Sequence, residues 1–123
     1  MKDKPHVLLV DDDPYLVELM SLILAQAGYR VDTAADGAAA CRRVEQHAYD
    51  LIILDMQMPV LDGLGFLSWL RGEQKSQIPV CVLTAENREQ TEERIRQAGA
   101  DWIGFKPIDT QVLLDQARQL LAG

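Results

Sequence analysis

The sequence has few of the residues that build disulfide frameworks or thiol and imidazole metal sites. Of its 123 residues, two are cysteine and two are histidine. Cys41 and Cys81 stand far apart and form no metal-ligand pair, so we expect two free thiols in the cytosol. His6 and His47 lack neighbouring ligands at a suitable spacing, and we expect both to be ordinary surface residues.

The sequence also lacks a segment that would enter a membrane. No run reaches the roughly 18 apolar residues of a membrane span, and no long apolar stretch follows the N-terminal lysines as in a secretory signal. Basic residues are outnumbered, with 12 Lys and Arg against 19 Asp and Glu, for a net charge of −7. Because DNA phosphates are neutralised by a basic surface, direct nucleic-acid binding is not expected. A cytoplasmic domain that binds cations or docks onto a protein fits better.

The chain does contain enough apolar residues for one core. Hydrophobic residues make up 48% and charged residues 25%, the balance of a soluble globular protein. The length is typical of one domain, and no linker, repeat or low-complexity segment divides it. We therefore expect a single domain over residues 1–123.

Strand-like and helix-like apolar patterns alternate along the chain. The expected strands are 6–10, 29–34, 51–54, 79–83 and 102–105. The expected helices are 14–27, 38–47, 63–71, 88–97 and 112–121. Four consecutive aliphatic residues at 51–54 indicate a central strand buried on both faces. The alternation predicts an α/β fold: a flavodoxin-like, doubly wound, five-stranded parallel sheet of order 2-1-3-4-5 with five helices.

The first helix has a clear expected start. Asp13 suits the N-cap and Pro14 the first helical position, where a missing N–H does no harm. Gly28 can close the helix at its other end. The residues expected to share its inward face are Leu16, Leu19, Met20, Ile23 and Ala27.

Polar residues that can bind ions or react follow four of the five expected strands. Asp11 and Asp12 follow the first, Asp55 the third, Thr84 the fourth and Lys106 the fifth. In such sheets ligands bind at the carboxyl ends of the strands. Three carboxylates within about 5 Å would repel by roughly 3 kcal/mol per pair at an effective dielectric near 20, so such a site needs a cation. Oxygen-only ligands indicate Mg²⁺ or a similar hard ion.

A metal ion, a lysine and a hydroxyl together suit a phosphoryl group. The metal and Lys106 would neutralise its oxygens, and Thr84 could donate a hydrogen bond. Asp55 is the natural nucleophile, because it stands between the paired acids and the Thr84 and Lys106 side. Each residue alone has an ordinary interpretation as a cap, a turn residue or a surface charge. Their joint placement at one edge of the sheet favours a phosphoacceptor pocket.

Four segments in the right order resemble the receiver domains of two-component response regulators, over nearly the whole chain. They are Val10-Asp11-Asp12, the run from Leu54 to Gly63, Leu83-Thr84-Ala85, and Gly99-Ala100-Asp101 leading to Phe105-Lys106-Pro107. The resemblance implies that Asp55 accepts a phosphoryl group from a phosphohistidine on a sensor histidine kinase or a histidine phosphotransfer protein. The domain would be no enzyme beyond its own phosphotransfer and autodephosphorylation.

The resemblance also implies how the site is divided. Asp12 would ligate Mg²⁺, or Mn²⁺ in its place, directly, and Asp11 would do so through water. Asp55 and the backbone carbonyl of Gln57 would complete the protein ligands. Thr84 and Lys106 would contact the phosphoryl oxygens, and the peptide bond between Lys106 and Pro107 would be cis.

The implied output is a change in the face formed by the fourth helix, fifth strand and fifth helix. That face would control another partner or a C-terminal effector domain outside this chain, in a monomer or a phosphorylation-dependent dimer. Ile103 stands where receiver domains usually carry an aromatic residue, and strand alternation puts Trp102 on the opposite face. We therefore expect the change to pass through the loop at 84–86 and the following helix without a rotating ring.

The polar segment at 86–97 supports two compatible interpretations. It holds one large apolar residue, Ile95, among many charges. One interpretation is an exposed helix held by pairs such as Glu92 and Arg96. The other is a loosely docked element that phosphorylation moves.

Two other functions compete with a phosphorylation-controlled switch. One is a metal-dependent phosphatase or phosphotransferase, although Gln57 stands where such an enzyme would need a second acid and 123 residues leave no lid. The other is a phosphate-independent pseudo-receiver that only binds a partner. Ile103 favours that alternative, whereas the intact acids, Thr84 and Lys106 argue against it.

Overall fold

The computed structural model describes residues 4–58 and 61–122, which form five strands and the helices that cover them. The strands are β1 (His6–Val10), β2 (Arg30–Ala34), β3 (Leu51–Asp55), β4 (Val80–Thr84) and β5 (Trp102–Phe105). The helices are α1 (Pro14–Gln26), α2 (Gly37–Gln46), α3 (Gly63–Ser68), α4 (Arg88–Ala98) and α5 (Thr110–Ala122). The predicted helix at 63–71 is thus divided, because the chain after Ser68 winds as a π-helical turn, η1 (Trp69–Glu73).

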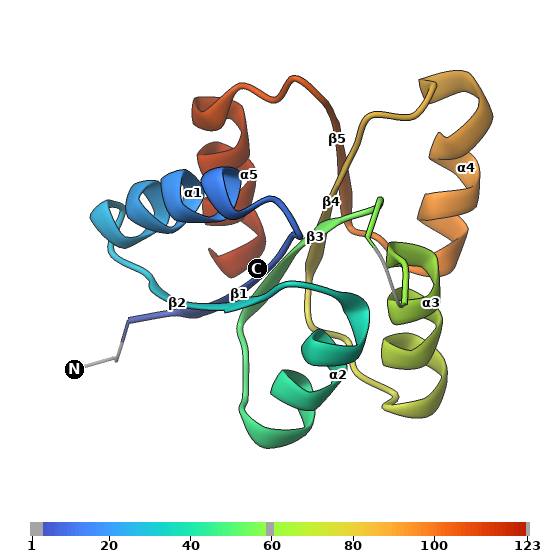
Figure 1. The fold of residues 1–123 in the computed structure, drawn as a ribbon, viewed down its shortest axis with the longest axis horizontal. Coiled ribbons are helices and arrows are strands. Elements are labelled where there is room, and N and C mark those ends of the chain that lie inside the picture. The colour runs from blue at the N-terminus through green and yellow to red at the C-terminus, as the bar shows by residue number, and fades with distance from the viewer. Residues whose placement is uncertain (1–3, 59–60, 123) are drawn as a thin grey trace.

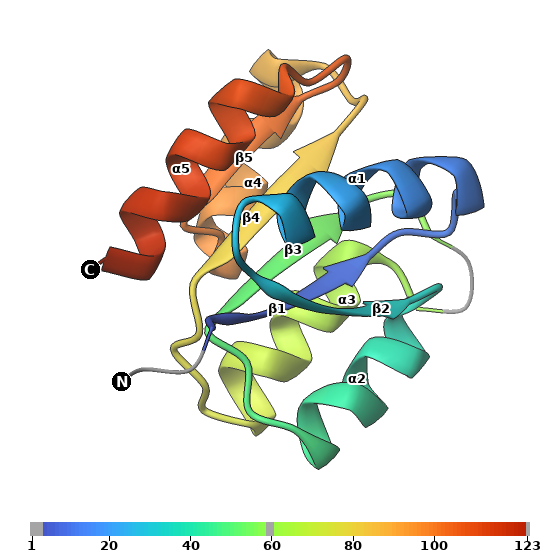
Figure 2. The same ribbon diagram turned by 90° about the vertical axis from the view of Figure 1, so that its left-hand side faces the viewer.

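The five strands form one parallel sheet in the order β2-β1-β3-β4-β5, which confirms the predicted fold class. Figures 1 and 2 show α1 and α5 on one face of the sheet and α2, α3 and α4 on the other. All five residues of β3 are buried, as the aliphatic run predicts for a central strand between two helical layers. No helix in the described part of the chain is long and apolar enough to cross a membrane.

Side chains at alternate strand positions pack into two separate hydrophobic cores, one on each face of the sheet. Ile52 and Leu54 pack on the side of α2, α3 and α4, whereas Leu51 and Ile53 pack on the side of α1 and α5. At β5, Ile103 joins the first core and Trp102 the second. The predicted separation of these two side chains onto opposite faces is therefore confirmed.

The inward face of α1 differs from the prediction. Leu19 is 53% exposed and Ala27 is also exposed, whereas Met20 and Leu24 are buried in the core. The helix carries apolar residues on almost every side, so the 3.6-residue period does not single out one face. The predicted helix start is confirmed, since the Asp13 side chain accepts hydrogen bonds from the first backbone N–H groups of α1.

His6 is not the surface residue that the sequence predicts. Its side chain is 13% exposed, and its Nε2 lies 3.0 Å from Asp32 Oδ2. The Tyr49 hydroxyl donates to the same Asp32 oxygen at 2.7 Å, and the His6 backbone N–H donates to Asp50 Oδ2 at 2.8 Å. Burial is the largest single effect on the pKa of Asp32 and raises it. The contacts with Tyr49 and His6 lower it by more in total, so the pKa of Asp32 lies below its usual value. This cluster lies at the amino ends of the strands, whereas His47 is exposed as predicted.

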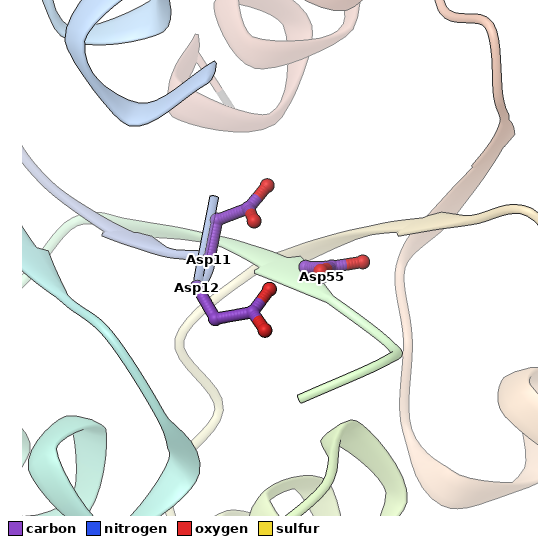
Figure 3. Close-up of side chains that lie close together, drawn as sticks. All are labelled: Asp11, Asp12 and Asp55. Carbon is purple, nitrogen blue, oxygen red and sulfur yellow. The ribbon is translucent and has the colours of Figure 1, made fainter. Parts of the chain in front are cut away.

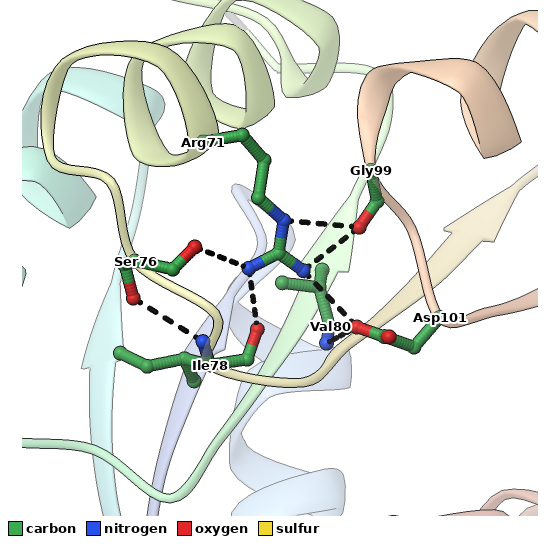
Figure 4. A network of polar contacts seen from close by, with 6 residues as sticks. All are labelled: Arg71, Ser76, Ile78, Val80, Gly99 and Asp101. Carbon is green, nitrogen blue, oxygen red and sulfur yellow. Dashed lines mark hydrogen bonds and ion pairs between the residues drawn. The ribbon is translucent and has the colours of Figure 1, made fainter.

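Arg71, in η1, ties three segments together (Figure 4). Its Nε and Nη2 donate to the carbonyl of Gly99 at 3.1 and 2.8 Å, and its Nη1 donates to those of Ser76 and Ile78 at 2.9 and 2.8 Å. Its Nη2 also pairs with Asp101 Oδ2 at 3.0 Å. We call this set of contacts the Arg71 clasp. It fixes the C-terminal end of α4 to the segment that enters β4.

The positions of the two free cysteines predict unequal reactivity. Cys81 lies in β4 with no exposed surface, and burial, assisted by the charge of Asp101, raises its thiol pKa to about 12. Because the thiolate is the reactive form, native Cys81 is expected to resist iodoacetamide at pH 8, while half-buried Cys41 reacts slowly. Peptide mass mapping of native and denatured protein checks this. Equal alkylation of both thiols in the native protein would contradict it.

Candidate functional site

The carboxyl ends of four strands bring the sequence-predicted residues to one edge of the sheet. Asp11 and Asp12 directly follow β1, and Asp55 is the last residue of β3. Thr84 ends β4, and Lys106 directly follows β5. Parallel register aligns these ends, with Val10 beside Leu54 and Asp55 beside Leu83. The three aspartates are drawn together in Figure 3.

The three aspartates form one acidic cluster. Each offers a carboxylate oxygen, and these oxygens lie within 4.8 Å of one another. Asp11 and Asp55 are buried, whereas Asp12 is exposed. Burial raises the pKa of Asp11, and the charges of Asp55 and Asp12 raise it further, against the opposing effects of the Asp13 N–H bond and Lys106. An oxygen-only set of crowded carboxylates fits a hard divalent cation such as Mg²⁺.

Lys106 is the direct cationic partner of Asp55. Its Nζ lies 3.0 Å from Asp55 Oδ1, and the aspartate side chain is 4% exposed. A buried carboxylate requires such a partner, because leaving a charge buried and unpaired is strongly unfavourable. The peptide bond between Lys106 and Pro107 is cis, as the family resemblance implies. The ammonium group thus lies on the Asp55 side of the acidic cluster.

The side chain of Gln57 has contacts that the sequence did not reveal. Its Nε2 donates to Glu86 Oε1 at 3.0 Å and lies 3.4 Å from Thr84 Oγ1. Its Oε1 accepts from the Ala85 N–H at 3.4 Å. Thr84 Oγ1 also accepts from the Glu86 N–H at 3.1 Å. The resemblance assigns a metal-ligand role to the Gln57 backbone carbonyl, and the sequence places Gln57 and Glu86 two residues after Asp55 and Thr84. It did not predict the hydrogen bond between their side chains.

The assembled groups have complementary chemical capacities. The acidic cluster can hold a cation, Lys106 can neutralise an anion beside Asp55, and Thr84 presents a hydroxyl at the same edge. Gln57 and Glu86 line a shallow hollow together with Asp12. Such a set suits the transfer of a charged group to a carboxylate oxygen more than acid–base work on a neutral substrate.

The strand order and this edge of acids, lysine and threonine define a doubly wound α/β domain with a polar site at the carboxyl ends of its strands. The family model of the response regulator receiver domain matches residues 7–118. The chain therefore belongs to the response regulator receiver domain family.

Two curated relatives show how such a domain occurs in longer proteins. The chain is 37% identical over 118 residues to the DNA-binding dual master transcriptional regulator RpaA of Synechocystis, covering 95% of this chain and 49% of that protein. It is 36% identical over 120 residues to the sensor protein EvgS of Escherichia coli, covering 98% of this chain and 10% of that protein. The chain thus spans about half the length of RpaA and a small part of EvgS.

A solved structure adds a liganded relative. The response regulator TrrA of Thermotoga maritima, in complex with Mg²⁺ and BeF, matches with a TM-score of 0.84 and 31% identity. The match covers 94% of this chain and 98% of that chain. The likeness therefore extends over nearly the whole fold.

Proposed function

We propose that Asp55 accepts a phosphoryl group from a phosphohistidine on a sensor histidine kinase or a histidine phosphotransfer protein, in a Mg²⁺-dependent reaction. The observation that carries this proposal is the surroundings of Asp55. Its buried carboxylate shares a cluster with Asp11 and Asp12 and lies 3.0 Å from the Lys106 ammonium. The TrrA complex supports it, because beryllofluoride is a tetrahedral stand-in for a phosphoryl group.

In the proposed reaction a carboxylate oxygen of Asp55 forms the new bond to phosphorus as the bond to the imidazole nitrogen of the donor breaks. The imidazole leaves with the electron pair and then takes up a proton. Asp11, Asp12, Asp55 and the Gln57 carbonyl would hold Mg²⁺, or Mn²⁺, which supplies neutralisation of the developing charge. Lys106 and the hydroxyl of Thr84 would bind phosphoryl oxygens. Water would later hydrolyse the acyl phosphate, which is the autodephosphorylation step.

An exposed apolar surface beside the site favours a protein as the phosphodonor. Tyr15, Leu19 and Leu22 on α1 are 84%, 53% and 58% exposed. A groove of about 260 Å³ between α1 and the start of α5 continues from Leu19 to Lys106. Contiguous exposed apolar side chains are characteristic of protein interaction sites. A donor that covers this surface would bring its phosphohistidine to the edge that holds Asp55.

The proposed output is a rearrangement of the α4–β5–α5 face that controls a partner or an effector domain. Arg88 at the start of α4 lies over the Phe105 ring of β5, 4.3 Å from its centroid, so the two elements already touch at this face. The length of RpaA beyond the matched region supports an attached effector in a longer regulator. We propose no nucleic-acid contact by residues 1–123 themselves, given their net charge of −7. A cytoplasmic location suits the free thiols. The protein would be a monomer or a phosphorylation-dependent dimer.

The test is covalent labelling of Asp55. The protein is incubated with Mg²⁺ and acetyl phosphate, and intact mass spectrometry is expected to show one acid-stable, base-labile phosphoryl adduct. Asp55→Asn should show none, whereas the control Asp109→Asn should be labelled like the wild type. An adduct that persists in Asp55→Asn would overturn the assignment. No adduct on the wild type would favour the pseudo-receiver, and rapid turnover of many phosphate esters would favour an enzyme.

A further inference from the structure

We infer that the side chain of Gln57 is a positioning residue that couples the phosphoryl site to α4 through Glu86 and Arg94. This inference rests on the proposed function of Asp55 and adds a route by which its modification is transmitted. Gln57 follows β3, Glu86 lies between β4 and α4, and Arg94 lies within α4. The three side chains form a continuous polar chain from the acidic edge to the helix.

The Gln57 amide is oriented by what surrounds it. Its NH₂ group faces the Glu86 carboxylate at 3.0 Å, and its oxygen faces the Ala85 N–H at 3.4 Å. The reverse orientation would set the amide oxygen against the carboxylate and the NH₂ group against an N–H donor. One side chain therefore holds both the backbone and the side chain of the loop that follows β4.

Glu86 divides its contacts between the site and the helix. Its Oε1 accepts from Gln57, its Oε2 pairs with Arg94 Nη2 at 3.2 Å, and its backbone N–H donates to the Thr84 hydroxyl at 3.1 Å. The carboxylate thus links a residue beside Asp55 to the second turn of α4. Because these groups are partly or largely exposed, each contact is weak and exchangeable.

The two ends of α4 are held unequally. At its C-terminal end the Arg71 clasp binds the Gly99 carbonyl, and Ile95 is fully buried. Towards its N-terminal end Arg88 and Glu89 are exposed, and the helix is held by the buried Thr91 and by Arg88 over the Phe105 ring. A loss of the Glu86 contacts would therefore loosen the first two turns of α4 more than its last turn.

A phosphoryl group on Asp55 would compete for the groups that hold this chain together. Thr84 Oγ1 accepts hydrogen bonds from both Gln57 and Glu86, and a movement of this hydroxyl towards a phosphoryl oxygen would weaken them. The new group carries about −1.5 to −2 charges and attracts the Gln57 NH₂ away from Glu86. Glu86 then faces an added negative charge without its amide partner. This route requires no aromatic ring at Ile103.

Hydrogen exchange of the unphosphorylated protein tests the chain itself. In Gln57→Met, backbone amides in the second turn of α4, whose acceptors lie within the helix, are expected to exchange about three- to tenfold faster than in the wild type. That is the size expected when the hydrogen bond to Glu86 is lost. The matched control is Gln111→Met, since Gln111 Nε2 donates to Asp115 at 3.0 Å on α5, away from the site. Equal exchange in α4 of the two variants would overturn the inference.

A double-mutant comparison separates a connected chain from independent contacts. Arg94→Met should accelerate the same amides, and Gln57→Met combined with Arg94→Met should add little to either change alone. Fully additive effects would overturn the inference, because they would show that Gln57 and Arg94 act separately.

The phosphorylated protein distinguishes this inference from the proposed function. The Asp55 adduct is first verified by mass in the same sample. The phosphorylated wild type is then expected to show the same faster exchange in α4 as the unphosphorylated Gln57→Met variant. An adduct that leaves α4 exchange unchanged would overturn the inference and leave the proposed function intact. No adduct on the wild type would overturn both the proposed function and this coupling step, whatever the exchange data show for the resting chain.

Discussion

Replacing Asp11 with asparagine is expected to raise the melting temperature of the metal-free protein while reducing phosphoryl transfer to Asp55 by at least about a hundredfold. Asp11 is buried, and its carboxylate lies within 4.8 Å of those of Asp12 and Asp55. Without a cation, removing this charge relieves roughly 1–2 kcal/mol of repulsion and desolvation. For a domain of this size that corresponds to an increase of about 3–8 °C. The raised pKa of Asp11 has the same physical origin.

The measurement pairs thermal unfolding with labelling by acetyl phosphate, each with and without Mg²⁺. Saturating Mg²⁺ should stabilise the wild type by about 2.7 kcal/mol at a hundred times its Kd, and the variant by much less. Asp109→Asn is a matched control. Asp109 Oδ1 accepts from a backbone N–H two residues later, as Asp11 Oδ1 does, at 2.8 against 3.0 Å. A variant that is less stable than the wild type without metal would contradict the account of crowded charge.

Replacing Arg71 with methionine is expected to destabilise the protein by about 2–4 kcal/mol, lowering its melting temperature by roughly 10 °C. The Arg71 side chain is 21% exposed, and it supplies donors to the carbonyls of Gly99, Ser76 and Ile78. Methionine keeps the apolar stem but leaves these partly buried carbonyls without their donor. Chemical denaturation monitored by tryptophan fluorescence gives the free energy of unfolding.

Two further variants define what the Arg71 clasp contributes. Arg71→Lys should recover little of the lost stability, because a single ammonium cannot reproduce five donors in a planar fork. Arg118→Met should change stability by less than about 0.5 kcal/mol, since that side chain is 71% exposed and pairs with Asp115 at 3.4 Å. A loss for Arg71→Met no larger than for Arg118→Met would show that solvent replaces the clasp without penalty.

The sheet order and the residues at its carboxyl edge could be predicted from the sequence for one physical reason. Parallel strands joined by helices permit few topologies, and all of them bring the strand ends together. The alternation within β5 likewise separated Ile103 from Trp102 correctly, because a strand has a strict period of two. These predictions depend on backbone geometry and not on particular side-chain contacts.

The predictions that failed depend on contacts between distant segments. The face of α1 was ambiguous because apolar residues surround that helix, and its packing on the sheet and α5 selected Met20 and Leu24. His6 meets Asp32 only through the pairing of β1 with β2. The Gln57 bridge depends on the conformations of two loops, which neither periodicity nor propensity determines.

Substitutions at the two ends of the sheet should affect stability in opposite directions, as the cluster of His6, Asp32 and Tyr49 shows when it is compared with the acidic edge. At the amino ends of the strands the Asp32 carboxylate has favourable partners in the Tyr49 hydroxyl and the His6 ring, so their replacement should weaken the fold. At the carboxyl ends like charges are crowded, and neutral replacements should make the fold more robust. Selection for heat resistance by itself would therefore erode the acidic edge first. Continued selection for the chemistry of that edge is what would preserve it.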